Sequence, residues 1–208
     1  MFSLALLLAL ATISPAVPAA SVTSGAAIAV CFSPEEDCAA FAVRAIDNAE
    51  RQILVGAYGL TTGSGIVEAL VGAKGRGVDV RLIADKTTPC PATSGVEPLV
   101  AAGVPIRIDA QARIAHAKTM VIDDAVTLMG SYNWTRGAAA NSENLNLISS
   151  PAVGAAGTPR GVRSIQTARG LVPGLAIDNA SARRSARKCL TWDYGASFGA
   201  SSTAAITG

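Results

Sequence analysis

Residues 115–134 read AHAKTMVIDDAVTLMGSYNW, in which two short apolar runs flank the pair Asp123-Asp124. This pattern is typical of two β-strands joined by a tight turn at the aspartates. Side chains at positions i and i+2 of a strand project to the same side, so His116 and Lys118 should point the same way. The strands expected here span residues 115–122 and 126–129, and a third spans 144–148.

The polar residues around this imidazole are suited to a phosphodiester. The segment Gly130-Ser131-Tyr132-Asn133 follows the second strand, and Glu143 precedes the third. A lysine can neutralise the non-bridging oxygens, while Ser131 and Asn133 can donate hydrogen bonds to them. An imidazole can attack phosphorus when a carboxylate holds its other nitrogen. We therefore expect a phosphodiesterase site with His116 as the nucleophile.

The alternative interpretation is that His116 and Lys118 merely decorate the surface. Lys118, however, is expected on a strand turned toward the interior, and Glu143 lies among apolar residues. Charged groups in such places are costly unless they are paired or used. This cost favours the functional interpretation.

Upstream, apolar runs alternate with amphipathic stretches. Ser33 and Pro34 have the character of an N-cap and a first helical residue, so a helix is expected from there to about Ala49. Repeated strand–helix–strand units predict an α/β fold with a mixed, mostly parallel sheet flanked by helices. The other strands expected span residues 27–32, 53–58, 79–85 and 104–108, and the other helices span 65–74 and 95–102.

The two ends of the chain differ from this central region. An apolar run followed by prolines and small residues is typical of a secretory signal peptide over residues 1–19, with an uncleaved membrane anchor as the alternative. Residues 151–208 lack periodicity, which favours a disordered basic tail over a nucleic-acid-binding arm. Residues 1–150 carry 10 Lys/Arg and 13 Asp/Glu (net −3), and residues 151–208 carry 7 and 2 (net +5). The charge of the central region therefore gives no argument for a nucleic-acid partner.

The four cysteines are consistent with an exported, periplasmic or secreted protein. Cys31 and Cys38 are close enough in sequence to clip the first strand to the first helix through a disulfide. Cys90 and Cys189 remain, and their pairing would tie the tail to the core. Metal binding is the weaker alternative, because the sequence has no C-x-x-C pair and its only histidine is elsewhere.

The motif H-x-K-x4-D-x6-G-S-x-N resembles the signature of the phospholipase D superfamily. The resemblance extends over about residues 30–148 and is most specific to small exported bacterial endonucleases of the Nuc type. It implies a phospholipase D-like catalytic domain over residues 26–150, followed by a divergent tail. The motif residues are His116, Lys118, Asp123, Gly130, Ser131 and Asn133.

Members of this superfamily use two such motifs, in one chain or across a dimer, and this chain has a single histidine. The resemblance therefore implies a homodimer in which the two His116 side chains meet at a two-fold axis. One would attack phosphorus and form a phosphohistidine. The other would protonate the leaving oxygen and then activate water.

The resemblance also implies a role for each remaining residue. No metal or other cofactor is needed, because lysines from both chains supply the positive charge. Lys118 and Asn133 would hold the phosphate, Ser131 would support that site, Glu143 would orient the imidazole, and Asp123 and Gly130 would support the local structure.

Three functions remain open from the sequence. The first is a metal-independent, non-specific endonuclease acting on DNA, with RNA as a further candidate and with no stable membrane association once the signal is cleaved. The second is a lipid phosphodiesterase, which would need an apolar rim, for which Tyr132 and Trp134 are the candidates. The third is a non-catalytic remnant, because the chain after Ser150 lacks the amphipathic helix with which relatives continue. A shifted reading frame is one hypothesis for that change in composition.

Overall fold

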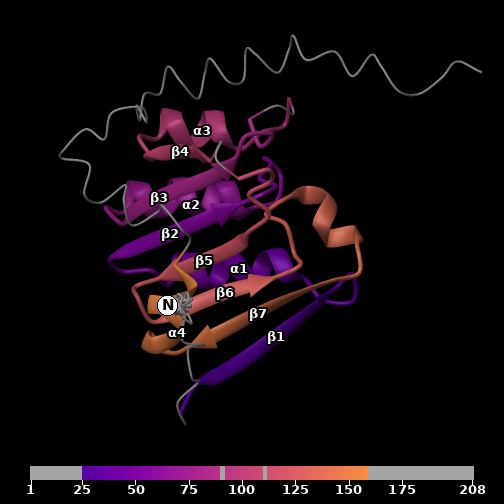
Figure 1. The fold of residues 1–208 in the computed structure, drawn as a ribbon, viewed down its shortest axis with the longest axis vertical. Helices are drawn as coiled ribbons and strands as arrows, with labels where there is room; N and C mark the ends of the chain where they lie inside the picture. The colour runs from indigo at the N-terminus through magenta and orange to yellow at the C-terminus, as the bar shows by residue number, and fades with distance from the viewer. Residues whose placement is uncertain (1–24, 90–91, 110–111, 159–208) are drawn as a thin grey trace, which may run out of the picture.

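The computed structural model describes residues 25–89, 92–109 and 112–158 (Figure 1). The expected signal peptide, Cys90, Cys189 and the tail from residue 159 onward lie outside the described residues. In chain order the elements are β1 (Ala27–Ser33), α1 (Cys38–Asp47), β2 (Gln52–Ala57), α2 (Ile66–Gly75), β3 (Asp79–Asp85), α3 (Val96–Ala101), β4 (Ile106–Asp109), β5 (Lys118–Ile122), β6 (Val126–Gly130), the 3₁₀ helix η1 (Arg136–Ala140), β7 (Glu143–Ser149) and α4 (Pro151–Gly157).

The seven strands form one mixed sheet in the order β1-β7-β6-β5-β2-β3-β4. The α/β class expected from the sequence is confirmed, but the expectation of a mostly parallel sheet is wrong. Only β2–β3 and β3–β4 pair in parallel within the described residues, and the other four pairings are antiparallel. For β5–β6 the reason is the short turn at Asp123 and Asp124, both with positive φ, because so tight a connection can join only antiparallel strands.

Helices cover the two faces of the sheet unequally (Figure 1). Helices α1, α2 and α3 lie on one face, where their apolar side chains share a core with alternate residues of the strands, such as Val55, Leu82 and Met120. Helix α4 lies on the opposite face, where Gly157 approaches the side chain of Thr127 on β6. None of the helices in the described ranges has the length and apolar character needed to cross a membrane.

The helix α4 corrects the expectation that the irregular tail begins at residue 151. A segment of proline, glycine and alanine with a single valine has too few large apolar side chains to show helical periodicity, so the sequence pattern could not indicate it. Its close packing instead depends on small residues. A Cβ atom on Gly154 would clash with the carbonyl oxygen of Asp124, so the helix approaches the β5–β6 turn at backbone contact distance.

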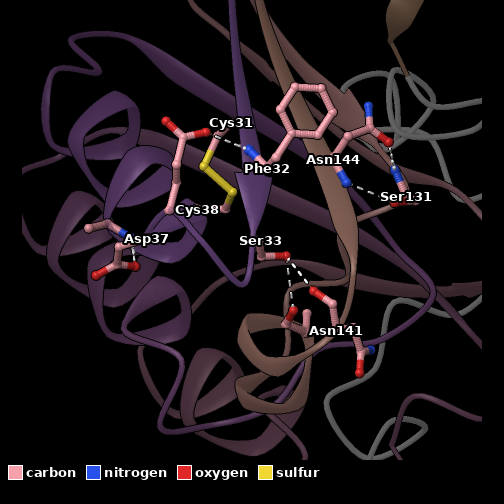
Figure 2. Close-up of a disulfide and its surroundings, with 11 residues drawn as sticks. Cys31, Phe32, Ser33, Asp37, Cys38, Ser131, Asn141 and Asn144 are labelled. Atoms are coloured by element: carbon pink, nitrogen blue, oxygen red, sulfur yellow. Dashed lines mark hydrogen bonds between the residues drawn. A yellow bond between two sulfur atoms is a disulfide. The ribbon is translucent and has the colours of Figure 1, made fainter.

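The start of the first helix also differs from the expectation. Helix α1 begins at Cys38, and its N-cap is Asp37, whose side chain accepts a hydrogen bond from the Ala40 N–H at 2.9 Å. Ser33 is instead the last residue of β1, and its buried hydroxyl donates to the carbonyl oxygen of Asn141 at 2.9 Å (Figure 2). The Ser33 hydroxyl therefore bonds to a residue distant in sequence and does not form the helix cap that the local sequence predicts.

The Cys31–Cys38 disulfide closes the connection between β1 and α1 (Figure 2). The two Cα atoms are 5.6 Å apart, and both side chains are buried. This is the pair that the sequence suggested. The bridge fixes the end of β1, the edge strand that pairs with β7 and places Ser33 opposite Glu143.

Candidate active site

His116 lies two residues before β5, at the end of the sheet where β2 and β3 also finish. The expected strand over residues 115–122 begins only at Lys118, but hydrogen bonds still fix the backbone of the preceding residues. The Ala117 carbonyl accepts a hydrogen bond from the Tyr58 N–H at 2.9 Å, and the Ala115 N–H donates to the Asp85 carboxylate at 2.7 Å. The ends of β2 and β3 thus fix the backbone that carries an exposed imidazole.

The ammonium group of Lys118 lies directly against this imidazole. Its Nζ atom is 3.1 Å from Nδ1 and 3.0 Å from Nε2 of His116, and it donates to the His116 carbonyl at 3.2 Å. The side chain is 7% exposed, and this burial lowers the pKa of Lys118 below its usual 10.5, while the charge of Glu143 acts in the opposite direction. The pair expected from the spacing is therefore brought into contact.

Asn133 reaches the same end of the sheet through the segment that follows β6. The Trp134 N–H donates to the Gly59 carbonyl at 3.1 Å, and the Thr61 N–H donates to the Trp134 carbonyl at 3.0 Å. A Cβ atom on Gly59 would be 3.2 Å from the Asn133 Oδ1 atom, so that amide lies directly beside the residue that follows Tyr58. Its Oδ1 atom is buried and has no hydrogen-bond partner among the described residues, and because an amide oxygen can only accept, the group that could donate to a phosphate is the side-chain NH₂.

Ser131 is exposed at the end of β6 and is bonded to β7. Its hydroxyl accepts a hydrogen bond from the Asn144 N–H at 3.0 Å, and its own N–H donates to the Asn144 side chain at 3.3 Å (Figure 2). The hydroxyl proton is not used in either bond, so it can still be donated. This position is compatible with the supporting role that the sequence suggested.

Gly130, the motif residue before Ser131, has a steric role. A Cβ atom at this position would clash with the carbonyl oxygen of Asn144 on the neighbouring strand. Both groups belong to backbone within the sheet, so neither can move away cheaply. The glycine thus lets β6 and β7 approach where the polar residues emerge.

We expect Gly130→Ala to lower the free energy of unfolding by about 3 kcal/mol or to prevent folding, because it forces two strands apart. Urea denaturation measures this effect. Gly137→Ala is the matched control, because a Cβ atom there would meet nothing within 4 Å. Equal stability of the two variants would contradict the steric role.

Glu143 begins β7, and the resemblance implies that it orients the imidazole, but its described contacts differ from the expected one. Its Oε1 atom accepts a hydrogen bond from the Asn141 side chain at 3.2 Å. Its charge acts on two buried neighbours: it opposes the burial effect on the pKa of Lys118, and it adds to the effect of burial in raising the pKa of Tyr132. The charge of Glu143 therefore acts on the ammonium of Lys118. Its role in orienting His116 stays a proposal.

Asp123 lies at the far end of β5 from the imidazole and is occupied by the backbone. Its carboxylate accepts hydrogen bonds from the N–H groups of Glu50, Arg51 and Gln52 at 2.9, 2.8 and 2.9 Å. Burial alone would raise the pKa of Asp123, but these bonds and the Arg51 charge outweigh it and hold the pKa below its usual 3.8. The residue fastens the β5–β6 turn to the start of β2.

Because the folded-state pKa of Asp123 is lower than the unfolded one, its carboxylate stabilises the fold above about pH 3.8. That contribution is lost as the pH falls through the folded pKa. We expect Asp123→Asn to cost about 2 kcal/mol of unfolding free energy near pH 7, and the difference from the unmodified protein should shrink toward pH 2. Urea denaturation across this range measures both quantities. A constant difference would contradict the assignment.

Two further residues join the site although the sequence pattern did not single them out. Tyr58 packs its ring on His116, and the buried Asp85 anchors Ala115. Burial acts to raise the pKa of Asp85, but hydrogen bonds from Thr87 and Ala115 more than offset it and lower that pKa. Both residues stand at carboxyl ends of neighbouring parallel strands, a position that is itself a signal for functional residues.

Two further expectations concern a metal site and an apolar rim. No group of three or more His, Cys, Asp or Glu side chains within residues 25–89, 92–109 and 112–158 is arranged to hold a metal ion. Tyr132 and Trp134, the candidates for an apolar rim, are both fully buried, and the Trp134 indole N–H donates to the Gly56 carbonyl at 3.1 Å. The structure contradicts their assignment to a rim, because both belong to the core.

Comparison with known proteins identifies the family of this fold. Residues 42–156, more than half of the chain, match the family described as "Cardiolipin synthase, PLD-like domain". A protein named phospholipase D from Rickettsia conorii is 35% identical over 129 residues, which are 62% of this chain and 64% of that protein. A mitochondrial cardiolipin hydrolase from Chlamydomonas reinhardtii is 35% identical over 91 residues, 43% of this chain and 41% of that protein. The chain thus spans less than two thirds of the length of these relatives.

Solved structures agree with this assignment. The phospholipase D family member Nuc from Salmonella typhimurium is 31% identical, with a TM-score of 0.58, over 68% of this chain and 90% of that chain. NucT from Helicobacter pylori shares the fold at 19% identity, with a TM-score of 0.54, over 68% of this chain and 92% of that one. Since the family model covers most of the sheet and the Nuc structure is matched over nearly its whole length, this chain belongs to the phospholipase D-like family.

Proposed function

We propose that this protein is a metal-independent phosphodiesterase in which His116 attacks phosphorus. The observation that carries the proposal is the contact between the exposed His116 imidazole and the buried ammonium of Lys118, at 3.0 and 3.1 Å from the two ring nitrogens. A nucleophile open to solvent and a cation held beside it are the two groups that a phosphodiester needs first. Asn133, on the segment that docks beside Tyr58, is a third polar residue at this end of the sheet, and its side-chain NH₂ could donate to a non-bridging oxygen.

The ammonium cannot donate to an imidazole nitrogen and leave the lone pair of that nitrogen free to attack. We propose that the non-bridging oxygens of an arriving phosphodiester accept the hydrogen bonds of Lys118 and so release His116. Partial burial favours this exchange, because a poorly solvated ammonium interacts strongly with a phosphate. The lysine would then supply the positive charge that a metal ion supplies in other phosphodiesterases.

The reaction would proceed in two steps. In the first, an imidazole nitrogen forms a bond to phosphorus while the bond from phosphorus to the leaving oxygen breaks and that oxygen takes a proton. In the second, water attacks phosphorus, the nitrogen–phosphorus bond breaks, and a base accepts the proton of the water. A proton donor that becomes a base is therefore required in addition to the nucleophile.

We propose that a second copy of the chain supplies this donor. The sequence contains one histidine, so a second imidazole can come only from another molecule. His116 is exposed at one end of the sheet, where a two-fold axis could bring two copies together. The nucleophile and the acid would then be the same residue in two subunits of a homodimer.

Nucleic acid is the substrate class that we favour, with DNA cleaved internally and without sequence specificity. The motif resembles that of the Nuc-type endonucleases, and Nuc itself is matched over 90% of its chain. The burial of Tyr132 and Trp134 removes the aromatic rim that a lipid substrate would use. A lipid phosphodiester remains the second candidate, because relatives carry lipid-hydrolase names and Ile114, two residues before His116, is 52% exposed.

We further propose that the protein acts in the periplasm or outside the cell. The Cys31–Cys38 disulfide supports an oxidising compartment, because reducing conditions inside the cell keep such pairs open. The expected signal peptide would direct the chain there.

The proposal is tested by incubating the purified protein with plasmid DNA and, separately, with phosphatidylcholine and cardiolipin vesicles, all in excess EDTA. We expect nicking and linearisation of the plasmid and no release of head groups. Cleavage that requires an added divalent cation would contradict the metal-independent mechanism. Head-group release without DNA cleavage would select the lipid candidate, and inactivity on every substrate would favour a non-catalytic remnant.

A further inference from the structure

The backbone of Tyr58 is anchored beside the site by hydrogen bonds on both sides of the residue. It follows the last residue of β2, its N–H donates to the Ala117 carbonyl at 2.9 Å, and its carbonyl accepts the Thr88 hydroxyl at 2.7 Å. These bonds tie the tyrosine backbone to the segment that carries His116 and to the loop after β3. The sheet therefore fixes the point from which the Tyr58 side chain projects.

The ring contacts both members of the histidine–lysine pair. Its centroid is 4.4 Å from that of the His116 imidazole, with the two planes inclined at 55°, and the Lys118 Nζ atom is 4.8 Å from the Tyr58 centroid. Both distances are within the range of favourable aromatic and cation–π contacts. Since Lys118 also reaches the imidazole nitrogens, each of the three side chains touches the other two.

We infer that Tyr58 is a positioning residue that fixes the imidazole of His116 for attack. This inference rests on the proposed function. An exposed imidazole without a lateral contact would rotate about its side-chain bonds. When Lys118 donates its hydrogen bonds to a phosphate instead of the imidazole, the Tyr58 ring still packs against His116. A nucleophile displaced by about 1 Å loses about 100-fold in rate, so the contact affects the chemical step more than binding.

The face of the ring makes these contacts, so the hydroxyl group is not required. We expect Tyr58→Leu to lower kcat about 30-fold with KM changed by less than about 3-fold, and Tyr58→Phe to keep kcat within about 3-fold of the unmodified enzyme. Plasmid nicking in EDTA measures both constants. Tyr58→Met, which also fills the space without a ring, serves as a second variant if the leucine variant does not fold.

The single histidine allows a readout that does not depend on activity. The imidazole protons of His116 give one set of NMR signals, and the ring current of a tyrosine at 4.4 Å must shift them. We expect Tyr58→Leu to change these shifts and Tyr58→Phe to preserve them. The same spectra show whether each variant is folded.

The outcomes separate this inference from the proposed function. If the unmodified enzyme cleaves DNA and requires His116, but Tyr58→Leu keeps both its kcat and its imidazole shifts, the inference alone is overturned. Equal losses in the phenylalanine and leucine variants would also overturn it, because the hydroxyl would then be responsible. If His116→Ala is as active as the unmodified enzyme, the proposed function fails and the positioning role fails with it.

Discussion

Replacing His116 with alanine is expected to lower kcat on a phosphodiester by about 10⁴-fold or more, because the variant has no group that can form the covalent intermediate. The fold should remain intact. The imidazole is exposed, and substitutions at exposed positions usually change the unfolding free energy by no more than about 0.5 kcal/mol. Initial rates of plasmid nicking in excess EDTA, together with urea denaturation, measure the two effects separately.

Glu97→Ala provides the matched control, because Glu97 is an exposed residue of α3 and lies in a different part of the fold. It should cleave DNA at the unmodified rate. Activity in His116→Ala comparable to that of this control would contradict the assignment of the nucleophile. Loss of activity accompanied by unfolding would contradict the claim that the effect is chemical.

The intermediate itself provides a second readout of the same prediction. A substrate labelled at phosphorus should transfer its label to the protein during turnover, and the linkage should be stable in alkali and labile in acid, as a bond between phosphorus and an imidazole nitrogen is. Because the chain has one histidine, the labelled peptide must contain residue 116. Label recovered on any other residue would contradict the mechanism.

The parts of the site that were predictable from sequence are those set by local geometry. His116 and Lys118 are two residues apart, and any extended backbone places their side chains on one side. The Asp123-Asp124 turn was also predictable, because residues of this type tolerate the positive φ values that a tight connection requires. In both cases the deciding information lies within a few residues.

The parts that sequence reasoning missed depend on how distant segments meet. Tyr58 reaches His116, and Asp85 reaches the neighbouring Ala115, because β5 pairs antiparallel to β2 beside the parallel pair β2–β3. No local pattern states that pairing. For Ser33 the local pattern was misleading. It predicted that the hydroxyl caps a helix, but the hydroxyl donates to the carbonyl of the distant residue Asn141. The helix α4 was missed because its stability comes from close backbone packing, which leaves no periodic signal.

Glu143 illustrates how the structure refines a role assigned by resemblance. Its expected partner was the imidazole, yet its charge acts on Lys118 and Tyr132. A carboxylate beside a buried ammonium keeps that ammonium charged, and a charged lysine is what a phosphate requires. The effect of Glu143 on the pKa of Lys118 is therefore the one link between this carboxylate and the histidine–lysine pair among the described residues.

The central claim is that each active site contains His116 from two chains, and a mixed dimer tests it most directly. One subunit would carry the unmodified sequence and the other His116→Ala, each with a different affinity tag, so that two purification steps isolate the mixed species. If one imidazole attacks and the other donates the proton, the mixed dimer lacks one of the two functions. General acid catalysis contributes about 100-fold or more, so we expect its kcat to fall at least about 100-fold below that of the unmodified dimer.

A dimer of unmodified subunits that passes through the same two purification steps with two different tags controls for handling. Retention of about half of its activity by the mixed dimer would contradict the account, because each subunit would then contain a complete and independent site. A protein that cleaves DNA as a monomer would contradict it equally. We expect instead that His116→Ala in one subunit of the pair inactivates the site that both subunits share.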